Sequence, residues 1–305
     1  MPALGLGTWM AEPGEVAAAI KEAIQIGYRH IDCASIYGNE KEIGAAFEEV
    51  FAEGQVARDD LWITSKLWSN RHAEEDVVPA IQESIQALRC EYLDLYLVHW
   101  PVAIRADATP PTQPEDLVAL DELPLEATWR GMEQALELGL ARHIGVSNYS
   151  AKKLTQHLSM AHKPEMNQVE LHPYLAQPKL LEFSKQHGIH LTAYSPLGSS
   201  GRPESMKAEG ERALLEEPIV LAIAERLSIT PAQVLLAWAL QRGTAAIPKS
   251  VNSERLAQNF AAASITLDDG AMAELAGLDA HRRYVSGDFW AKPGSPYTVA
   301  DLWDE

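Results

Sequence analysis

Cysteine is scarce in this chain of 305 residues, because only Cys33 and Cys90 occur, each within or beside an apolar run. Two such cysteines do not indicate a disulfide framework. Long apolar runs are also missing: no segment reaches about 18 uninterrupted apolar residues, and the N-terminus lacks the basic and apolar regions of a signal peptide. We therefore expect a cytoplasmic protein with no membrane partner.

Basic residues are outnumbered, with 25 Lys and Arg against 43 Asp and Glu and a net charge of -18. A surface of this charge repels nucleic acid phosphates and anionic lipids, which argues against a nucleic-acid partner. An anionic ligand must then be held by a few local cations. Isolated basic residues such as Lys249 and Arg255 therefore carry information.

Two motifs are absent. The G-x-G-x-x-G fingerprint of a doubly wound dinucleotide-binding fold is incomplete, because Gly5 and Gly7 are followed by Thr8, Trp9 and Met10. No H-x-H pair occurs, and His187 and His190 flank a glycine in a predicted helix-to-strand connection. The spacing of a metal-dependent barrel hydrolase is therefore missing, and we expect no metal site.

Short apolar runs are present eight times, and most are followed by a segment of helical spacing. The runs are ALGLGTW, YRHIDCAS, LWITSKLW, LDLYLVHW, RHIGVSN, MNQVEL, IHLTAYSPL and AAIPKS. In the helical segments, Val16, Ile20 and Ile24 share one face, as do Val77, Ile81, Ile85 and Leu88. Continuous apolar strands that alternate with amphipathic helices favour a parallel sheet buried on both faces. We predict an α/β protein, a (β/α)8 TIM barrel formed by one domain over residues 1–305.

Three segments break this alternation: residues 101–127, residues 198–217 and the tail at residues 281–305. The first two follow predicted strands, so in a barrel they would rise over the C-terminal face, where barrels carry their chemistry. The tail is rich in aromatic residues, and we predict that it folds back toward the same mouth. The alternative is that it packs on the outer helices.

Four polar residues fall at or just beyond the ends of three consecutive predicted strands: Asp32 and Tyr37, Lys66, and His99. Each alone has an ordinary structural explanation, but in a barrel all four converge. Carbonyl reduction leaves an alkoxide that must take a proton, and a tyrosine near a lysine ammonium can supply it because the cation favours tyrosinate. We predict Tyr37 as the general acid, Lys66 and Asp32 as the pair that lowers its pKa, and His99 as the group that orients the carbonyl.

The ordered blocks GLGTW, YRHIDCASIYGNE, TSKLW, DLYLVHWP, GVSN, NQVELHP, YSPLGS and IPKS resemble the motifs of the aldo-keto reductases, from residue 5 to about residue 260. The resemblance implies a (β/α)8 barrel and a catalytic tetrad of Asp32, Tyr37, Lys66 and His99. Members usually carry a β-hairpin ahead of the first block, which would cover the barrel floor. If nothing precedes Met1 in the natural protein, we expect the floor to be open or covered in another way.

The resemblance also assigns the cofactor residues. It places Ser147, Asn148 and Gln168 on the nicotinamide carboxamide and Tyr194 against its ring, near Thr8 and Trp9. It places Ser195, Leu197 and Ser199 over the pyrophosphate and Lys249, Ser250, Arg255, Gln258 and Asn259 at the adenosine end. Lys249, Ser250 and Arg255 suit a 2′-phosphate, because arginine holds phosphate oxygens bidentately and lysine adds a point charge. We predict NADPH as the cofactor, with NADH accepted more weakly.

The expected substrate is a small carbonyl compound in a pocket formed by Trp9, Trp68, Trp100, Phe289 and Trp290. We predict an NADPH-dependent reductase of aldehydes and ketones, monomeric as is commonest in the family, with no obligate protein partner. The alternative is a barrel that binds NADP(H) as a sensor or regulatory subunit with little turnover.

Overall fold

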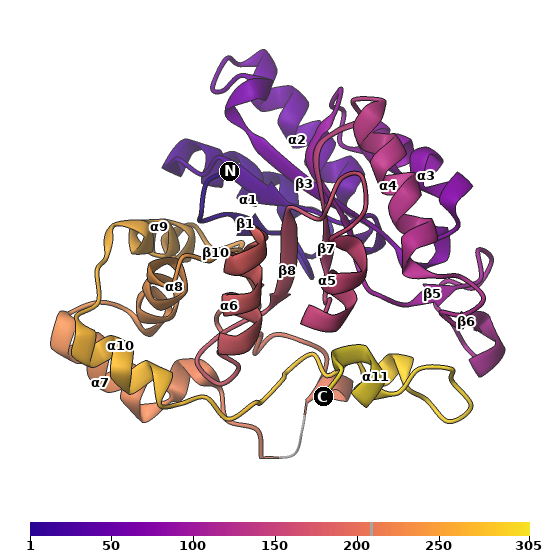
Figure 1. Ribbon diagram of the computed structural model, residues 1–305. Helices are drawn as coiled ribbons and strands as arrows, with labels where there is room; N and C mark the ends of the chain where they lie inside the picture. Colours follow the sequence, from indigo (N-terminus) through magenta and orange to yellow (C-terminus); the bar gives the residue numbers. More distant parts are fainter. Residues whose placement is uncertain (208–209) are drawn as a thin grey trace.

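The computed structural model describes residues 1–207 and 210–305, and its centre is a parallel eight-stranded sheet (Figure 1). In sheet order the strands are β1 (Leu6–Gly7), β2 (His30–Asp32), β3 (Trp62–Leu67), β4 (Leu93–Val98), β7 (Ala141–Ser147), β8 (Met166–Glu170), β9 (His190–Tyr194) and β10 (Ala245–Ala246). The Gly5 amide donates to the Ala246 carbonyl at 2.9 Å, and the Ala246 amide donates to Ala3 at 2.8 Å. These bonds join the first and last strands, so the sheet is a closed barrel, as predicted, and each of the eight apolar runs supplies one strand.

Helices surround the barrel: α1 (Val16–Ile26), α2 (Glu40–Ala52), α3 (Glu74–Ala87), α4 (Leu125–Glu137), α5 (Ala151–His157), α6 (Pro178–His187), α7 (Pro218–Leu227), α8 (Pro231–Gln241), α9 (Ser253–Ala261) and α10 (Asp269–Ala276). The predicted apolar face of α1 is buried, with Val16, Ile20 and Ile24 at most 2% exposed, and on α3 Val77 and Ile81 are buried while Ile85 is partly buried. Gly27 ends α1 at a φ of 123°, a conformation that favours glycine.

Strand β4 explains why the strand sequences are apolar without alternation. Leu95 and Leu97 pack with Met166 in one small cluster, whereas Tyr96 and Val98 belong to the main core shared with the helices. All six residues of β4 are buried. Both faces of the strand are therefore covered, as expected for a parallel barrel strand.

The segments that interrupt the alternation have structure of their own. Residues 101–127 contain a small antiparallel hairpin, β5 (Ala103–Ile104) and β6 (Leu117–Val118), which the sequence does not signal. The tail contributes Val285 and Trp290 to a cluster with Trp100, and its last helix α11 (Val299–Trp303) ends near α5 (Figure 1). The tail therefore packs mainly on the loops beyond the strand ends, as predicted, rather than on the outer helices.

No group of three or more His, Cys, Asp or Glu in residues 1–207 and 210–305 could hold a metal ion. No single helix of these segments is long and apolar enough to cross a membrane. Helices α7 and α8, which are bent relative to each other, reach the required length and apolar content only when they are taken together.

Candidate active site

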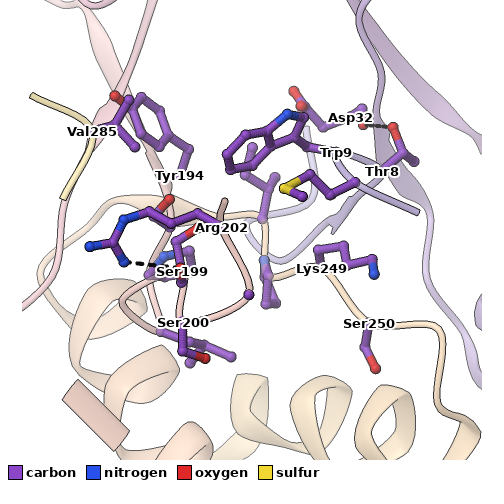
Figure 2. Close-up of a pocket in the computed structure, with 18 of the residues that line it drawn as sticks. Thr8, Trp9, Asp32, Tyr194, Ser199, Ser200, Arg202, Lys249, Ser250 and Val285 are labelled. Atoms are coloured by element: carbon purple, nitrogen blue, oxygen red, sulfur yellow. Dashed lines mark hydrogen bonds between the residues drawn. The ribbon is translucent and has the colours of Figure 1, made fainter. Parts of the chain in front are cut away.

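A cavity of about 960 Å³ opens at the C-terminal ends of the strands. Its wall includes Asp32 at the end of β2, His99 after β4 and Tyr194 at the end of β9. Figure 2 shows Tyr194 and Val285 toward one side of the cavity and Lys249 and Ser250 toward the other. The predicted cofactor residues that line it are Thr8, Trp9, Ser147, Asn148, Gln168, Tyr194, Ser195, Leu197, Ser199, Lys249, Ser250, Arg255, Gln258 and Asn259.

Asp32, Lys66 and Tyr37 form a hydrogen-bonded chain at the cavity wall. Strands β2 and β3 are parallel neighbours, with Asp32 in register with Thr64, which brings Lys66 beside the end of β2. The fully buried Lys66 ammonium donates to the Asp32 carboxylate, to the Cys33 carbonyl at 2.8 Å and to the Tyr37 hydroxyl at 3.4 Å. Tyr37 itself lies in the short turn Ser35–Tyr37 and faces the cavity.

Burial and charge act in opposite directions on these groups. Burial disfavours the charge on Lys66, but the attraction of Asp32 and Tyr37 outweighs it and raises the lysine pKa. Burial raises the pKa of Tyr37 to about 12, and the positive charge of Lys66 offsets only part of this rise. The sequence-based expectation of a net lowering is therefore wrong for the free protein, because desolvation of the phenol exceeds the effect of the cation. At neutral pH Tyr37 keeps its proton.

His99 lies edge-on to Tyr37 and Trp68, with ring centroids 5.8 and 5.1 Å away. Burial, together with the nearby charge of Lys66, lowers its pKa well below the usual value, so the imidazole is neutral. Its Nδ1 is buried and has no hydrogen-bond partner among the described residues. The Asn148 amide donates to the His99 carbonyl at 2.9 Å and fixes the backbone here.

Hydroxyl and amide side chains gather where β7, β8 and β9 end. The Ser147 hydroxyl donates to the Gln168 carbonyl at 2.8 Å, and the Gln168 amide donates to Asp32 Oδ2 at 2.7 Å. The Tyr194 hydroxyl donates to Asn148 Oδ1 at 2.7 Å. These bonds fix a flat aromatic ring and a set of polar atoms beside the Asp32 carboxylate.

Four residues of the cavity wall have positive φ without being glycine: Met10, Asn148, Ser195 and Ser199. Backbones of this kind cost free energy and gather at binding sites. The concentration around one cavity indicates that its wall is shaped for a ligand.

The far end of the cavity carries exposed cations. Lys249 and Arg255 form no ion pair with any residue of segments 1–207 and 210–305, whereas most other arginines outside the cavity face a carboxylate. Arg255 lies in the first turn of α9, where Asn252 caps the Arg255 amide at 2.9 Å. On a chain of net charge -18, this end of the cavity is suited to an anion.

Aromatic side chains form the opposite end. Four of the aromatic residues predicted for the substrate pocket, Trp9, Trp68, Trp100 and Phe289, line the cavity. Trp290 does not: it is 2% exposed and packs behind the wall, 5.7 Å from Trp68 and 6.1 Å from Trp100 between ring centroids. Neighbouring tail residues cannot both face the cavity here, and Phe289 takes that place.

Some lining residues have no specific signal in the sequence. Arg202 and Val285 lie in segments that were expected to border the mouth, but nothing in GSSGRP or RRYVSG distinguishes these two residues. Thr230 and Pro231, at the start of α8, also line the cavity. They come from a helix start that only the folded chain brings to the site.

Comparison with known proteins agrees with this geometry. The family model described as "Aldo/keto reductase family" matches residues 3–280. The chain belongs to this family. An aldo/keto reductase of Synechocystis sp. is 56% identical over 306 residues, covering 100% of this chain and 94% of that protein. Aldo-keto reductase family 1 member A1 of Rattus norvegicus is 46% identical, covering 93% of this chain and 88% of that protein.

The structure gives the same result. The aldose reductase of Schistosoma japonicum superposes with a TM-score of 0.85 at 40% identity, covering 94% of this chain and 91% of the other. The resemblance found in the sequence motifs is therefore confirmed. This aldo/keto reductase is an oxidoreductase, and its family acts on small carbonyl compounds.

Proposed function

We propose that this aldo/keto reductase reduces aldehydes and ketones to alcohols with NADPH, and that Tyr37 donates the proton. One observation carries the proposal. The protonated Tyr37 hydroxyl lies at the wall of a cavity, beside the buried Asp32–Lys66 pair. The same cavity continues to the cations Lys249 and Arg255, which form no ion pair within segments 1–207 and 210–305.

The polar and charged groups that line the cavity support NADPH as the cofactor. Ser147, Asn148 and Gln168 offer amide and hydroxyl groups for a carboxamide, and the Tyr194 ring offers a flat surface beside them. At the other end Lys249, Ser250 and Arg255 match a 2′-phosphate, which NADH lacks. The volume of about 960 Å³ lies near the top of the usual range for ligand pockets, about 300–1,000 Å³. When bound, NADPH supplies the hydride that adds to the carbonyl carbon.

The protein side chains supply the proton and orient the carbonyl group of the substrate. Tyr37 keeps its proton at neutral pH, and the buried Lys66 ammonium stabilises the phenolate that remains after transfer. Asp32 holds Lys66 charged and in place. Because a buried acceptor without a partner costs less than a buried donor, we assign the His99 proton to Nε2, which leaves Nδ1 bare. The neutral ring can then donate to a carbonyl oxygen.

The aromatic end of the cavity fits the apolar body of a carbonyl compound. Trp9, Trp68, Trp100 and Phe289 present ring surface there. Since Val285 and Phe289 of the tail complete the wall, we propose that residues 1–305 act as one unit.

A turnover assay tests the proposal against the NADP(H) sensor. NADPH oxidation is followed at neutral pH with methylglyoxal and with an aromatic aldehyde, and binding is followed by quenching of protein fluorescence. We expect NADPH to quench the protein fluorescence and to be oxidised only when an aldehyde is present. Quenching without oxidation by any aldehyde or ketone of a panel would support the sensor and reject the reductase.

A further inference from the structure

Glu170, the last residue of β8, has a fully buried carboxylate that no step of the proposed reaction uses. Its Oε1 accepts from the Tyr284 amide at 2.6 Å and from His172 Nε2 at 2.7 Å, and its Oε2 accepts from the Val285 amide at 2.7 Å. A buried carboxylate is costly unless each oxygen is satisfied, and here two of the donors belong to the tail backbone. Glu170 therefore fixes the tail to the end of a barrel strand.

The two tail residues that Glu170 holds contact different parts of the protein. Val285 lines the cavity, four residues before the aromatic wall at Phe289. Tyr284 points instead toward residues 198–207, which we call the nucleotide-side loop because it continues from Ser195 and Leu197. Two residues upstream of Glu170 on the same strand, Gln168 also lines the cavity.

Arg202 organises the nucleotide-side loop from inside. Its guanidinium donates to the carbonyls of Gly198, Ser199 and Met206 at 3.4, 3.2 and 3.1 Å and pairs with Glu211. The same group lies over the Tyr284 ring, 4.7 Å from its centroid. Figure 2 shows Arg202 bonded to Ser199 beside the cavity.

Tyr284 makes two further contacts, one with the loop and one beyond it. Its hydroxyl donates to the carbonyl of Arg212, which follows the loop in the chain, at 3.1 Å. A Cβ atom at Gly198 would lie 3.2 Å from the Tyr284 ring, so the loop packs directly on the tyrosine. Tyr284 therefore supports the nucleotide-side loop, and the next residue, Val285, forms part of the cavity wall. The Glu170 carboxylate holds the backbone of both.

We propose that Glu170 is a positioning residue that couples the nucleotide-side loop to the tail, so that cofactor binding and the substrate wall depend on the same anchor. This inference rests on the proposed function. In Glu170→Gln the amide nitrogen faces the N–H of either Tyr284 or Val285, so at least one of the two bonds to the tail is lost and the tail is held more weakly.

Hydrogen exchange read by mass spectrometry tests the coupling without turnover. The matched control is Thr128→Val, which removes a buried hydroxyl that donates to the His72 carbonyl at 2.7 Å, outside the cavity lining. In Glu170→Gln we expect exchange at least fivefold faster both at residues 284–290 and at residues 198–207, and no change there in the control. Faster exchange confined to the tail, or no difference from the control, would overturn the coupling.

Kinetics separates positioning from general destabilisation. In Glu170→Gln we expect the KM for an aromatic aldehyde and the Kd of NADPH each to rise about tenfold, while kcat and the KM for methylglyoxal stay within threefold. Equal rises for both aldehydes, or an unchanged NADPH Kd, would contradict the proposal. Tyr284→Leu keeps the amide that bonds Glu170 and removes only the ring against the loop, so the Kd of NADPH should rise while the KM for the aromatic aldehyde stays within threefold. This variant serves if Glu170→Gln does not fold, and an unchanged NADPH Kd would again contradict the proposal. Wild-type protein that binds NADPH but never turns over would reject the reductase function, and the exchange experiment would still test the coupling.

Discussion

The Lys66 ammonium lies 3.4 Å from the Tyr37 hydroxyl, with its other donors on the Asp32 carboxylate and the Cys33 carbonyl. The tyrosine keeps its proton in the free protein because burial raises its pKa to about 12. The lysine is nevertheless placed to stabilise the phenolate once the proton has left. The proposed proton donor and the charge that would compensate the loss of its proton therefore lie in one buried set of hydrogen bonds.

Lys66→Met tests how far the fold depends on this pair. The substitution leaves the Asp32 carboxylate buried without its cation, although the Gln168 amide still reaches Oδ2. We expect the free energy of unfolding in urea to fall by roughly 3–5 kcal/mol and kcat by at least about 100-fold.

The double variant Asp32→Asn with Lys66→Met is the matched control. It removes both charges, so most of the lost stability should return while activity stays low. If the single and double variants unfold at the same urea concentration, the unpaired carboxylate is not the source of the loss.

The barrel and the gathering of Asp32, Tyr37, Lys66 and His99 at one cavity could be predicted because both depend on local sequence patterns. Apolar runs mark the strands, and polar residues at successive strand ends must meet at one rim in a parallel barrel. The net pKa of Tyr37 could not be predicted. It depends on how completely the folded walls remove water from the phenol, which no spacing of residues reveals.

Arg255→Ala tests the 2′-phosphate assignment. We expect the Kd of NADPH to rise about 10- to 100-fold, because a charged hydrogen bond contributes about 1.5–3 kcal/mol, and the Kd of NADH to change less than twofold. Titration of fluorescence quenching measures both constants.

Arg226→Ala is the control for this experiment. Arg226 is also an exposed helical arginine, but it pairs with Glu274 and does not line the cavity. The Arg226→Ala variant should leave the Kd values of NADPH and NADH unchanged. Equal losses of NADPH and NADH affinity in Arg255→Ala would contradict the assignment.

Acid should destabilise the fold through its buried histidines. Burial lowers the pKa of His72 to about 3 and that of His30 to about 4. The unfolded chain, with a histidine pKa near 6.5, then binds more protons below that pH than the folded chain does. The contribution of each neutral histidine to the free energy of unfolding is fully present above pH 6.5. It falls by ~1.4 kcal/mol per pH unit for each histidine as the pH decreases toward 4.

His72→Gln checks this slope, because glutamine does not titrate. Urea unfolding between pH 6.5 and 4.5 should show a shallower loss of stability than in the wild type, by about 1.4 kcal/mol per pH unit. The exposed His162→Gln should keep the wild-type slope. Parallel slopes for all three proteins would show that His72 is not neutral in the fold.

The tail shows where sequence reasoning stops. Its aromatic composition predicts that it is buried near the mouth, but Phe289 and Trp290 are equivalent by composition. The backbone decides between them: the short turn Asp288–Trp290 directs Phe289 to the cavity and Trp290 into the cluster with Trp68 and Trp100. The proposed role of Glu170 was likewise hidden, because two of its three partners are backbone amides about 115 positions away.

Single-turnover reduction of an aromatic aldehyde by Tyr37→Phe tests the central claim most directly. Phenylalanine keeps the ring and removes only the hydroxyl that can donate a proton. We expect the rate of NADPH oxidation in the enzyme complex to fall by about 100- to 10,000-fold while the Kd of NADPH stays within twofold. A rate within threefold of the wild type would show that the proton comes from another group.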